Sequence, residues 1–570
     1  MILRELRKNV ISQCVKRKWP IACVFVYLVL ALHLTWPIIA SPFSHVPIGT
    51  EPTASVPLYN VWATWWNADR LAGGLFGYWD APIFYPTQGS FALMEPQPTT
   101  MVVAPVIWLT GSRILAYNVY VWICLVLNGV FAQRLAKIYG MGRWSALWAG
   151  AAMVLLPMVH WQLGIFQLAS LWGILWTWSA IEQLCREPSR RKGVELGVAA
   201  ALSFVSCMHH GLFLAILLVG AAPILWRQWI KFHELRHWGL AIVVALVITV
   251  PFVYQVRQVT EVHAIEWESD LVTDLSAKVS DYFHAPAHEL IDFGDDEQRS
   301  FFLSSGWLKY LLALAGIFYG LKRTQTRRWV SFLLAITVLA FFLSLGPNLK
   351  LGSFQPWWWL TENVPGFSRV RSVMRFAFFV QIPVIIFAAL GLGGIYQLSR
   401  DRIQRPKLQS AFRWALPLFA ILALVDGFPR KTGNAEITDV NKHRKWLEYV
   451  EENTSEEEGI LCLPVAPGPR VWQYLVTSEW MYLGTFHKAP IFNGYSSHFP
   501  QHYRNLRNQI LSGFPSKSIL EKFHRGKVKF IVVRAQKGSP ARNVKLGDFW
   551  LKRVCVDELV EVYELGKSGP

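Results

Sequence analysis

The hydrophobic positions of this chain come in long blocks that short polar connections separate. The apolar residues within a block do not alternate with polar ones, which is typical of helices that cross a membrane. Some blocks are shorter than the about 20 residues that a crossing helix needs, so tilted or re-entrant helices are expected. We predict eleven spans, at about 19–40, 115–133, 144–159, 165–184, 193–208, 211–226, 238–254, 306–321, 329–346, 375–397 and 414–428.

The pattern changes after residue 428, where apolar residues become sparser and periodic. The stretch "HRKWLEYVEEN" has the spacing of an amphipathic helix, and "GILCLPV", "KVKFIVVRA" and "LVEVYEL" have the composition of strands. A segment of this length can bury a core of its own. We therefore expect a mainly α protein, with a transmembrane helical bundle at 19–428 and a soluble α/β domain at 429–570.

The connections between the predicted spans divide sharply by charge. One set of connections holds 25 Lys and Arg residues in a total of 68 residues, and the other set holds 8 Lys and Arg residues in a total of 160. Because cytoplasmic loops carry the excess of Lys and Arg, the first set, which includes residues 1–18, is predicted to be cytoplasmic. An odd number of spans then places the C-terminal domain outside, together with two large outer loops at 41–113 and 255–305. The first block, which ends in "LTWPIIA", lacks a small-residue cleavage site and is expected to be a span rather than a signal peptide.

Composition supports a membrane protein and argues against nucleic acid as a partner. The chain is 53% hydrophobic and only 16% charged, and its net charge of +18 comes from cations that lie between apolar blocks. Membrane lipids are the partners that this arrangement fits. Seven cysteines without a CxxC pair support neither a zinc site nor a dense disulfide framework. Cys462 and Cys555 share the C-terminal region, either as a disulfide or as two buried thiols.

The first outer loop has two unusual segments. After Pro57, a helix with an aromatic face (Leu58, Val61, Trp62, Trp65 and Trp66) is expected to lie flat at the membrane interface. Further on, "GYWDAPIFYP" (77–86) combines prolines, aromatic rings and one carboxylate. It could hold Trp79 and Tyr85 rigidly against a sugar ring, with Asp80 as a base; alternatively, Asp80 caps a turn and the rings form an interfacial belt. The apolar stretch 101–109 is too short to cross.

Cations and imidazoles are expected at the outer ends of several spans. Arg369, Arg371 and Arg375 precede a span at the outer face, against the usual charge bias, and guanidinium groups bind phosphate through two parallel hydrogen bonds. Contact with lipid headgroups is the alternative. His160, His209 and His210 lie at the same face, where they could bind sugar or phosphate or serve as structural groups. Their spacing to acids matches no metal motif, so neither a divalent metal nor another cofactor is predicted.

Several segments together resemble the GT-C membrane glycosyltransferases, above all the bacterial GT-C-like polytopic proteins. These are the long first outer loop with an early acid, "WDAPIFYP", "NVPGFSRVRSVMRF" before a span ending in "LGLGG", and "FNGYSSHFP" in the tail. The resemblance implies a polyprenyl-phosphate-linked sugar donor, whose phosphate the arginines would bind. It also implies an essential outer-loop carboxylate, usually Asp. Glu51 stands about where that acid is expected, and Asp80, Glu95 and Asp69 follow as candidates in that order.

The resulting hypothesis is an inverting glycosyltransferase, transferring a hexose or pentose from a lipid-linked donor to an envelope glycan, lipid or protein. It would work at the outer face of a bacterial inner membrane. A non-catalytic envelope-assembly protein stays open because Glu replaces the usual Asp. A transporter of lipid-linked sugars is the third alternative. It would need charges in mid-membrane and inverted repeats, but Glu182 and Glu195 lie near cytoplasmic ends and no repeat is evident.

Overall fold

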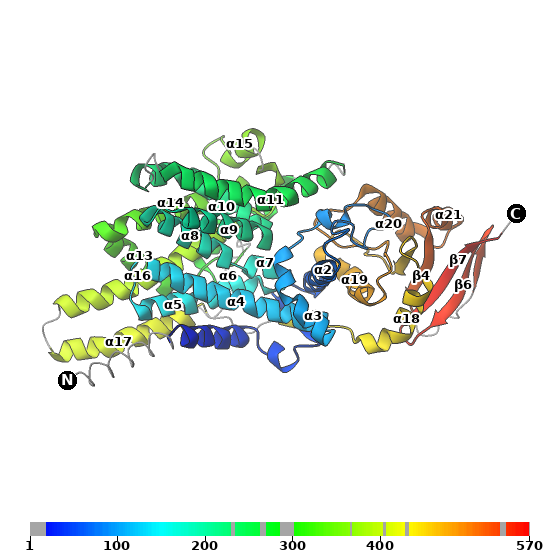
Figure 1. Ribbon diagram of the computed structural model, residues 1–570, viewed down its shortest axis with the longest axis horizontal. Coiled ribbons are helices and arrows are strands. Elements are labelled where there is room, and N and C mark those ends of the chain that lie inside the picture. The colour runs from blue at the N-terminus through cyan, green and yellow to red at the C-terminus, as the bar shows by residue number, and fades with distance from the viewer. Residues whose placement is uncertain are drawn as a thin grey trace.

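The predicted spans all form helices in the structure, a computed structural model. It describes residues 19–229, 234–262, 269–285, 301–364, 367–402, 406–427, 433–535 and 543–568. The molecule is elongated, with a helical bundle at one end and a sheet at the other (Figure 1). The helices at the predicted spans are Trp19–Leu34, α4 (Arg113–Ile138), α5 (Arg143–Val154) with α6 (Pro157–Trp161), α7 (Phe166–Ala169) with α8 (Trp172–Arg186), α9 (Arg190–Ser206), α10 (Met208–Trp229), α11 (Leu235–Val262), α13 (Trp307–Leu321), α14 (Thr324–Ser344), α16 (Phe378–Arg402) and α17 (Pro406–Val425).

Six helical segments in the described part of the chain are long and apolar enough to cross a membrane, as expected of an integral membrane protein. They are Arg113–Ile138, Arg143–Trp161, Leu163–Arg186, Leu235–Val259, Thr324–Ser344 and Val373–Asp401. Other predicted spans, such as Trp19–Leu34 and Trp307–Leu321, form shorter apolar helices. The total of eleven spans and their orientation therefore stay predictions.

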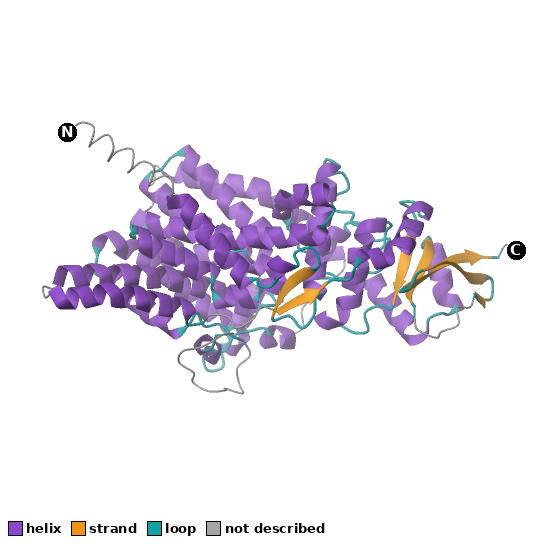
Figure 2. Ribbon diagram, turned by 90° about the horizontal axis from the view of Figure 1, so that it is seen from below, coloured by secondary structure: helices purple, strands orange, loops and turns teal. Residues whose placement is uncertain are grey.

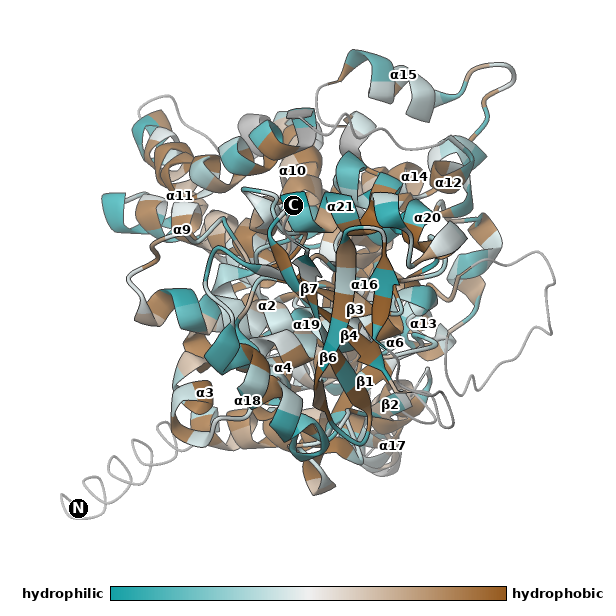
Figure 3. Ribbon diagram, turned by 90° about the vertical axis from the view of Figure 1, so that its right-hand side faces the viewer, coloured by the Kyte–Doolittle hydropathy of each residue, from teal (hydrophilic) through white to brown (hydrophobic). Residues whose placement is uncertain are grey.

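Glycines set the closest helix contact in the bundle. A Cβ atom on Gly316 of α13 would lie 1.9 Å from the carbonyl oxygen of Phe387 in α16, and one on Gly391 would lie 2.1 Å from that of Leu312. The "GLGG" stretch is thus a helix-packing surface. The helices α11 and α17 lie at the edge of the bundle (Figure 3). They carry exposed apolar side chains, including Val247 and Trp414, as lipid-facing helices do.

The predicted interfacial helix is α2 (Ser55–Ala72), and its expected position was wrong. Its five aromatic and aliphatic positions are buried, and α2 packs between α4 and α19 (Leu475–His487) of the C-terminal region. Its polar residues have tertiary partners: Asn60 donates to Gln167 Oε1 at 3.3 Å, and Asn67 donates to the Pro96 carbonyl at 2.7 Å. Because both polar positions are satisfied inside the protein, the helix needs no face in water.

The C-terminal region contains a β-sheet close to the C-terminus (Figure 2). The sheet has five strands in the order β3-β4-β7-β6-β5. β3 and β4 are parallel and the other pairs are antiparallel. The predicted helix is α18 (Arg444–Asn453), and the three predicted strands are β3 (Gly459–Leu463), β4 (Val528–Arg534) and β7 (Val560–Lys567). Cys462 and Cys555 are free, buried thiols. The pattern did not reveal β5 (Val544–Leu546), β6 (Phe549–Val556), α19, α20 (Gln501–Gly513) or α21 (Lys517–Arg525).

Besides the packing of α2 on α19, backbone hydrogen bonds join the first outer loop to the C-terminal region in two described segments. β1 (His45–Gly49) pairs antiparallel with β2 (Gly433–Glu436). Residues 82–85 form a second seam, in which Phe84 N–H donates to the Asn493 carbonyl at 3.1 Å and Ile491 N–H donates to the Pro82 carbonyl at 3.0 Å. Shorter helices of the predicted outer loops are α3 (Ala104–Thr110), α12 (Ser269–Asp274) and α15 (Pro356–Asn363).

Candidate active site

A cluster of acids, arginines and aromatic hydroxyls forms where four parts of the chain meet. The first outer loop contributes Glu51, Tyr59 and Glu95, and the break between α9 and α10 contributes Cys207 and His209. The segment before α16 contributes Arg371 and Arg375, and the C-terminal region contributes Tyr495. We call these residues the acid–arginine cluster. Its connections are the Arg375–His209 hydrogen bond, the Tyr59–Tyr495 ring contact at 5.7 Å, and the charge interactions of Arg375 with Glu51 and Glu95 and of Arg371 with Tyr495.

Glu51 reaches the cluster on a tight turn directly after β1. Its N–H donates to the Ile48 carbonyl at 2.9 Å, and Gly49 in between has a φ of 58°. A Cβ atom on Gly49 would lie 2.7 Å from the Trp161 carbonyl, so the turn is pressed against the end of α6. The Glu51 side chain is half-buried, and burial raises its pKa above the ordinary value, while the charge of Arg375 partly offsets this. A carboxylate with a raised pKa is well suited to accept a proton near neutral pH.

Glu95 is the most buried acid of the cluster, at 9% exposure. Its Oε1 accepts a hydrogen bond from Met208 N–H at the start of α10, where the helix dipole favours negative charge. Its own backbone N–H donates to the Tyr59 hydroxyl at 3.3 Å. Burial raises the pKa of Glu95, and the hydrogen bond from Met208 and the charge of Arg375 act against that rise. Glu95 therefore ties the outer loop to the start of α10.

Arg375 and His209 leave hydrogen-bond donors without acceptors in the middle of the cluster. Arg375 Nη1 lies 3.0 Å from His209 Nε2. A guanidinium can only donate, so Nε2 accepts and the imidazole proton resides on Nδ1. Both His209 Nδ1 and Arg375 Nε are buried, and neither has a partner among the described residues. Buried donors of this kind are expected to bind an acceptor, and beside a guanidinium an anionic oxygen is the acceptor that fits best.

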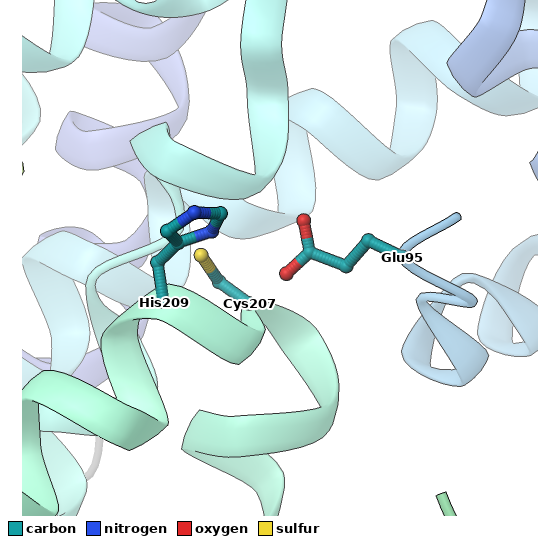
Figure 4. A group of neighbouring side chains, drawn as sticks. All are labelled: Glu95, Cys207 and His209. Carbon is teal, nitrogen blue, oxygen red and sulfur yellow. The ribbon is translucent and has the colours of Figure 1, made fainter. Parts of the chain in front are cut away.

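Three of these side chains could be considered for a metal ion. Potential ligand atoms of Glu95, Cys207 and His209 lie within 4.8 Å of one another, and Glu95 approaches the other two from the opposite side (Figure 4). However, Arg375 occupies the lone pair of His209 Nε2, and Nδ1 then carries a proton. The imidazole has no free lone pair for a metal in this arrangement, and a fixed guanidinium repels a cation. The geometry therefore fits an anion better than a metal.

In the structure, the aromatic segment of the first loop fits the second of its two expected roles, in which Asp80 caps a turn. Asp80 is exposed and accepts a hydrogen bond from Gly89 N–H at 2.7 Å, as a turn-capping residue does. Trp79 packs its ring on Phe91 and Phe252. The Tyr85 hydroxyl donates to the Glu457 carbonyl at 2.5 Å. In the described part of the chain, no recorded contact joins these three residues to the acid–arginine cluster.

The remaining candidates lie around the cluster. His160 is buried in α6, and its carbonyl lies under the turn that carries Glu51. His210 is also buried, with Nδ1 3.2 Å from the Ser170 carbonyl and its ring against Phe378. The backbone of Arg369 ends the short helix Phe367–Arg369, and its side chain lies outside the described residues. Asp69 forms an ion pair with Arg70 at 2.5 Å.

Sequence reasoning missed Tyr59, Cys207 and Tyr495. Tyr59 lies on the helix that was predicted to be interfacial, and Cys207 directly precedes "MHHG". Tyr495 lies within "FNGYSSHFP", which was used for the resemblance but not for the site. That segment and the first loop are more than four hundred residues apart in the sequence, and no local pattern predicts that they are in contact.

Taken together, the fold and the cluster define an integral membrane protein whose outer loop and C-terminal region enclose a polar site at one end of a helical bundle. The chain belongs to the family described as Domain of unknown function (DUF6311), whose model matches residues 82–405. That range contains the cluster residues from Glu95 to Arg375 and begins after Glu51. No curated protein matches the chain.

Solved structures show which fold this is. The chain is similar to the arabinofuranosyltransferase AftD from Mycobacteria, in two classes of one point mutant, with TM-scores of 0.53 and 0.52 and 15% identity in each case. The alignments cover 96% and 97% of this chain but 41% and 42% of AftD, so the chain spans about two fifths of that protein. ArnT from Cupriavidus metallidurans in the apo state matches with a TM-score of 0.43 and 13% identity, over 96% of this chain and 98% of ArnT. The AftD similarity supports the predicted GT-C-like fold.

Proposed function

We propose that this protein is a membrane glycosyltransferase that takes a sugar from a polyprenyl-phosphate donor and transfers it to an envelope acceptor at the outer face of the membrane. The observation that carries the proposal is the acid–arginine cluster. It combines a carboxylate with a raised pKa, two arginines and buried donors that have no acceptor among the described residues. A lipid-linked sugar phosphate would supply the missing acceptor, and the AftD-like fold agrees with this chemistry.

In the proposed reaction, Glu51 accepts the proton of the acceptor hydroxyl. The hydroxyl oxygen bonds to the anomeric carbon of the donor sugar while the bond from that carbon to the phosphate oxygen breaks. Arg371 and Arg375 stabilise the negative charge on the departing polyprenyl phosphate. A single displacement of this kind inverts the anomeric centre.

The other cluster residues would position these groups. Glu95 holds the first loop against α10, and the Arg375 hydrogen bond fixes the tautomer of His209, so that Nδ1–H is available to the phosphate. Tyr59 and Tyr495 bring two rings together beside Arg371, where a sugar could stack. Asp80 has no part in this mechanism, because its carboxylate caps an exposed turn.

The test uses the purified full chain and a panel of radiolabelled polyprenyl-phosphate sugars, with an envelope extract as the source of acceptor. We expect release of polyprenyl phosphate and movement of the label into the acceptor fraction for at least one donor. Donor binding without release would favour the non-catalytic alternative. In liposomes, label that crosses the bilayer while still attached to lipid would favour the transporter.

A further inference from the structure

The segment 459–520 of the C-terminal region is almost free of acids. Its 62 residues include five Lys and Arg residues and a single acid, Glu479. That acid forms an ion pair with Arg534 of β4, so its charge is already balanced. The segment contains both α20 and Tyr495 of the acid–arginine cluster. Its own acids therefore cannot neutralise its other cations.

Two arginines of α20 lie next to the cluster, and we call Arg504 and Arg507 the α20 arginine pair. Arg507 Nη1 donates to the Tyr474 hydroxyl at 2.6 Å, and the Tyr474 ring stacks on the Tyr495 ring with 4.9 Å between their centroids. Arg504 lies three residues earlier on the same face of α20 and also acts on Tyr474 through its charge. Tyr495 in turn interacts with the charge of Glu51. Two stacked tyrosines thus connect the arginine pair to the proposed base.

The α20 arginine pair has no acidic partner in the described part of the chain. Arg504 is exposed and has no hydrogen-bond or ion-pair partner there. Arg507 is half-buried, and its two hydrogen bonds go to neutral groups, the Tyr474 hydroxyl and Asn508 Oδ1. Its Nε is buried and has no acceptor among the described residues. The neutral partners orient the guanidinium and leave its charge available to an anion.

The surface of α20 around the pair also lacks acids. Its polar side chains include four amides, Gln501, Asn505, Asn508 and Gln509. Amides both donate and accept hydrogen bonds, as the hydroxyl groups of sugars do. The one acid of α21, which contacts α20, is Glu521, and it is paired with Arg525 at 2.5 Å. An anionic glycan would therefore meet cations and amides on α20.

We propose that the α20 arginine pair binds an acidic group of the acceptor, so that the acceptor is an anionic glycan. This inference rests on the proposed function and narrows its acceptor to a sugar chain that carries a carboxylate or a phosphate. Both groups offer anionic oxygens to a guanidinium. A membrane surface fits less well, because α20 lies farther from the helical bundle than α2 does (Figure 1).

The experiment measures oligosaccharide binding to the purified full chain in phosphatidylcholine nanodiscs, by isothermal titration calorimetry at low salt and without a sugar donor. The acidic probes are tetragalacturonic acid and mannopentaose 6-phosphate, and their neutral counterparts are tetragalactose and mannopentaose. The variant Arg504→Gln/Arg507→Gln removes both charges of the pair. Its matched control, Arg444→Gln/Arg525→Gln, removes two exposed arginines of the same region that have Glu partners at 2.6 and 2.5 Å.

We expect at least one acidic probe to bind wild type and the matched control equally, and to bind the double variant about tenfold more weakly or worse. The neutral counterpart should bind wild type about as weakly as the acidic probe binds the double variant. Arg504→Gln alone removes an exposed side chain without a partner among the described residues, and it should weaken acidic binding by about threefold. Preference for tetragalacturonic acid would identify a carboxylate, and preference for the phosphorylated probe would identify a phosphate. Thermal unfolding of each variant verifies that it is folded.

Equal binding of acidic and neutral probes, or equal weakening in the matched control, would overturn the proposal. Binding to phosphatidylglycerol vesicles instead of to acidic oligosaccharides, if the double variant loses it, would assign the pair to a lipid surface and also overturn the proposal. The donor-release assay separates this inference from the proposed function. Arginine-dependent binding of an acidic probe by a protein that transfers no sugar would refute the glycosyltransferase and keep the anionic-glycan site. Transfer to neutral acceptors at an unchanged rate in the double variant would refute the anionic acceptor and keep the glycosyltransferase.

Discussion

Replacing Glu51 by Gln tests the proposed reaction most directly. The amide keeps the size of the side chain and cannot take a proton, so the acceptor hydroxyl loses its base. Loss of a general base typically costs about 10²–10⁴-fold in rate, which corresponds to about 2.7–5.4 kcal/mol of transition-state stabilisation. We expect the upper part of this range, because the half-buried position limits access of water as a substitute base. The assay is release of polyprenyl phosphate from the labelled donor under single-turnover conditions.

Asp80→Asn is the matched control for Glu51→Gln. Asp80 accepts a hydrogen bond from Gly89 N–H, and an Asn side-chain oxygen can accept the same bond, so we expect wild-type rates. Thermal unfolding should differ little between Glu51→Gln and wild type, because the substitution removes a charge whose burial is unfavourable. Full activity in Glu51→Gln combined with loss in Asp80→Asn would refute the assignment and move the base to Asp80.

Three further predictions concern pH, donor binding and topology. Because burial raises the pKa of Glu51, the rate should fall on acidification at a higher pH than an ordinary glutamate would give; Glu95→Gln should keep this limb of the pH–rate profile if Glu51 is the base. Arg371→Lys should weaken donor binding about tenfold in a direct binding assay despite the retained charge, because an ammonium cannot form the two-bond fork; unchanged affinity at low salt would contradict a phosphate role. A reporter that is active only outside the cytoplasm should work after Pro570 and fail at Ser189, and the reverse would show an error in the span count.

The helical part of the fold could be predicted because each helix is encoded locally. An apolar block of sufficient length forms a helix in a membrane whatever its neighbours are, so helices formed at all the predicted blocks. The strands β3, β4 and β7 were recognisable for a similar reason, since each is a short run of β-branched and aliphatic residues. β6 alternates less clearly, with Lys552 and Arg553 in its middle, and was not recognised.

The position of α2 could not be predicted because it depends on distant partners. Its amphipathic pattern is compatible with a membrane surface, but Asn60 and Asn67 find hydrogen bonds inside the protein. The same limit applies to the candidate site. The two arginines were found from their residue type and their position before a span, and Glu51 and Glu95 were ranked among the loop acids with the help of the GT-C resemblance. Tyr495 enters the cluster only through long-range packing. Asp80 is a carboxylate, as a catalytic base requires, but it accepts a hydrogen bond from Gly89 N–H and caps a turn.

The pairing of β1 with β2 has a consequence for how the protein is made. Synthesis must add about 390 residues after His45 before its partner Glu436 exists. At about 5–20 residues per second, that interval is roughly 20–80 s. During this interval, the tryptophan-rich surface of α2 is not yet covered by α19. The strand β1, which directly precedes Glu51, has no partner strand until β2 is made. The candidate site is thus completed only when the last part of the chain has been synthesised, because Tyr495 and the partner strand of β1 both lie there.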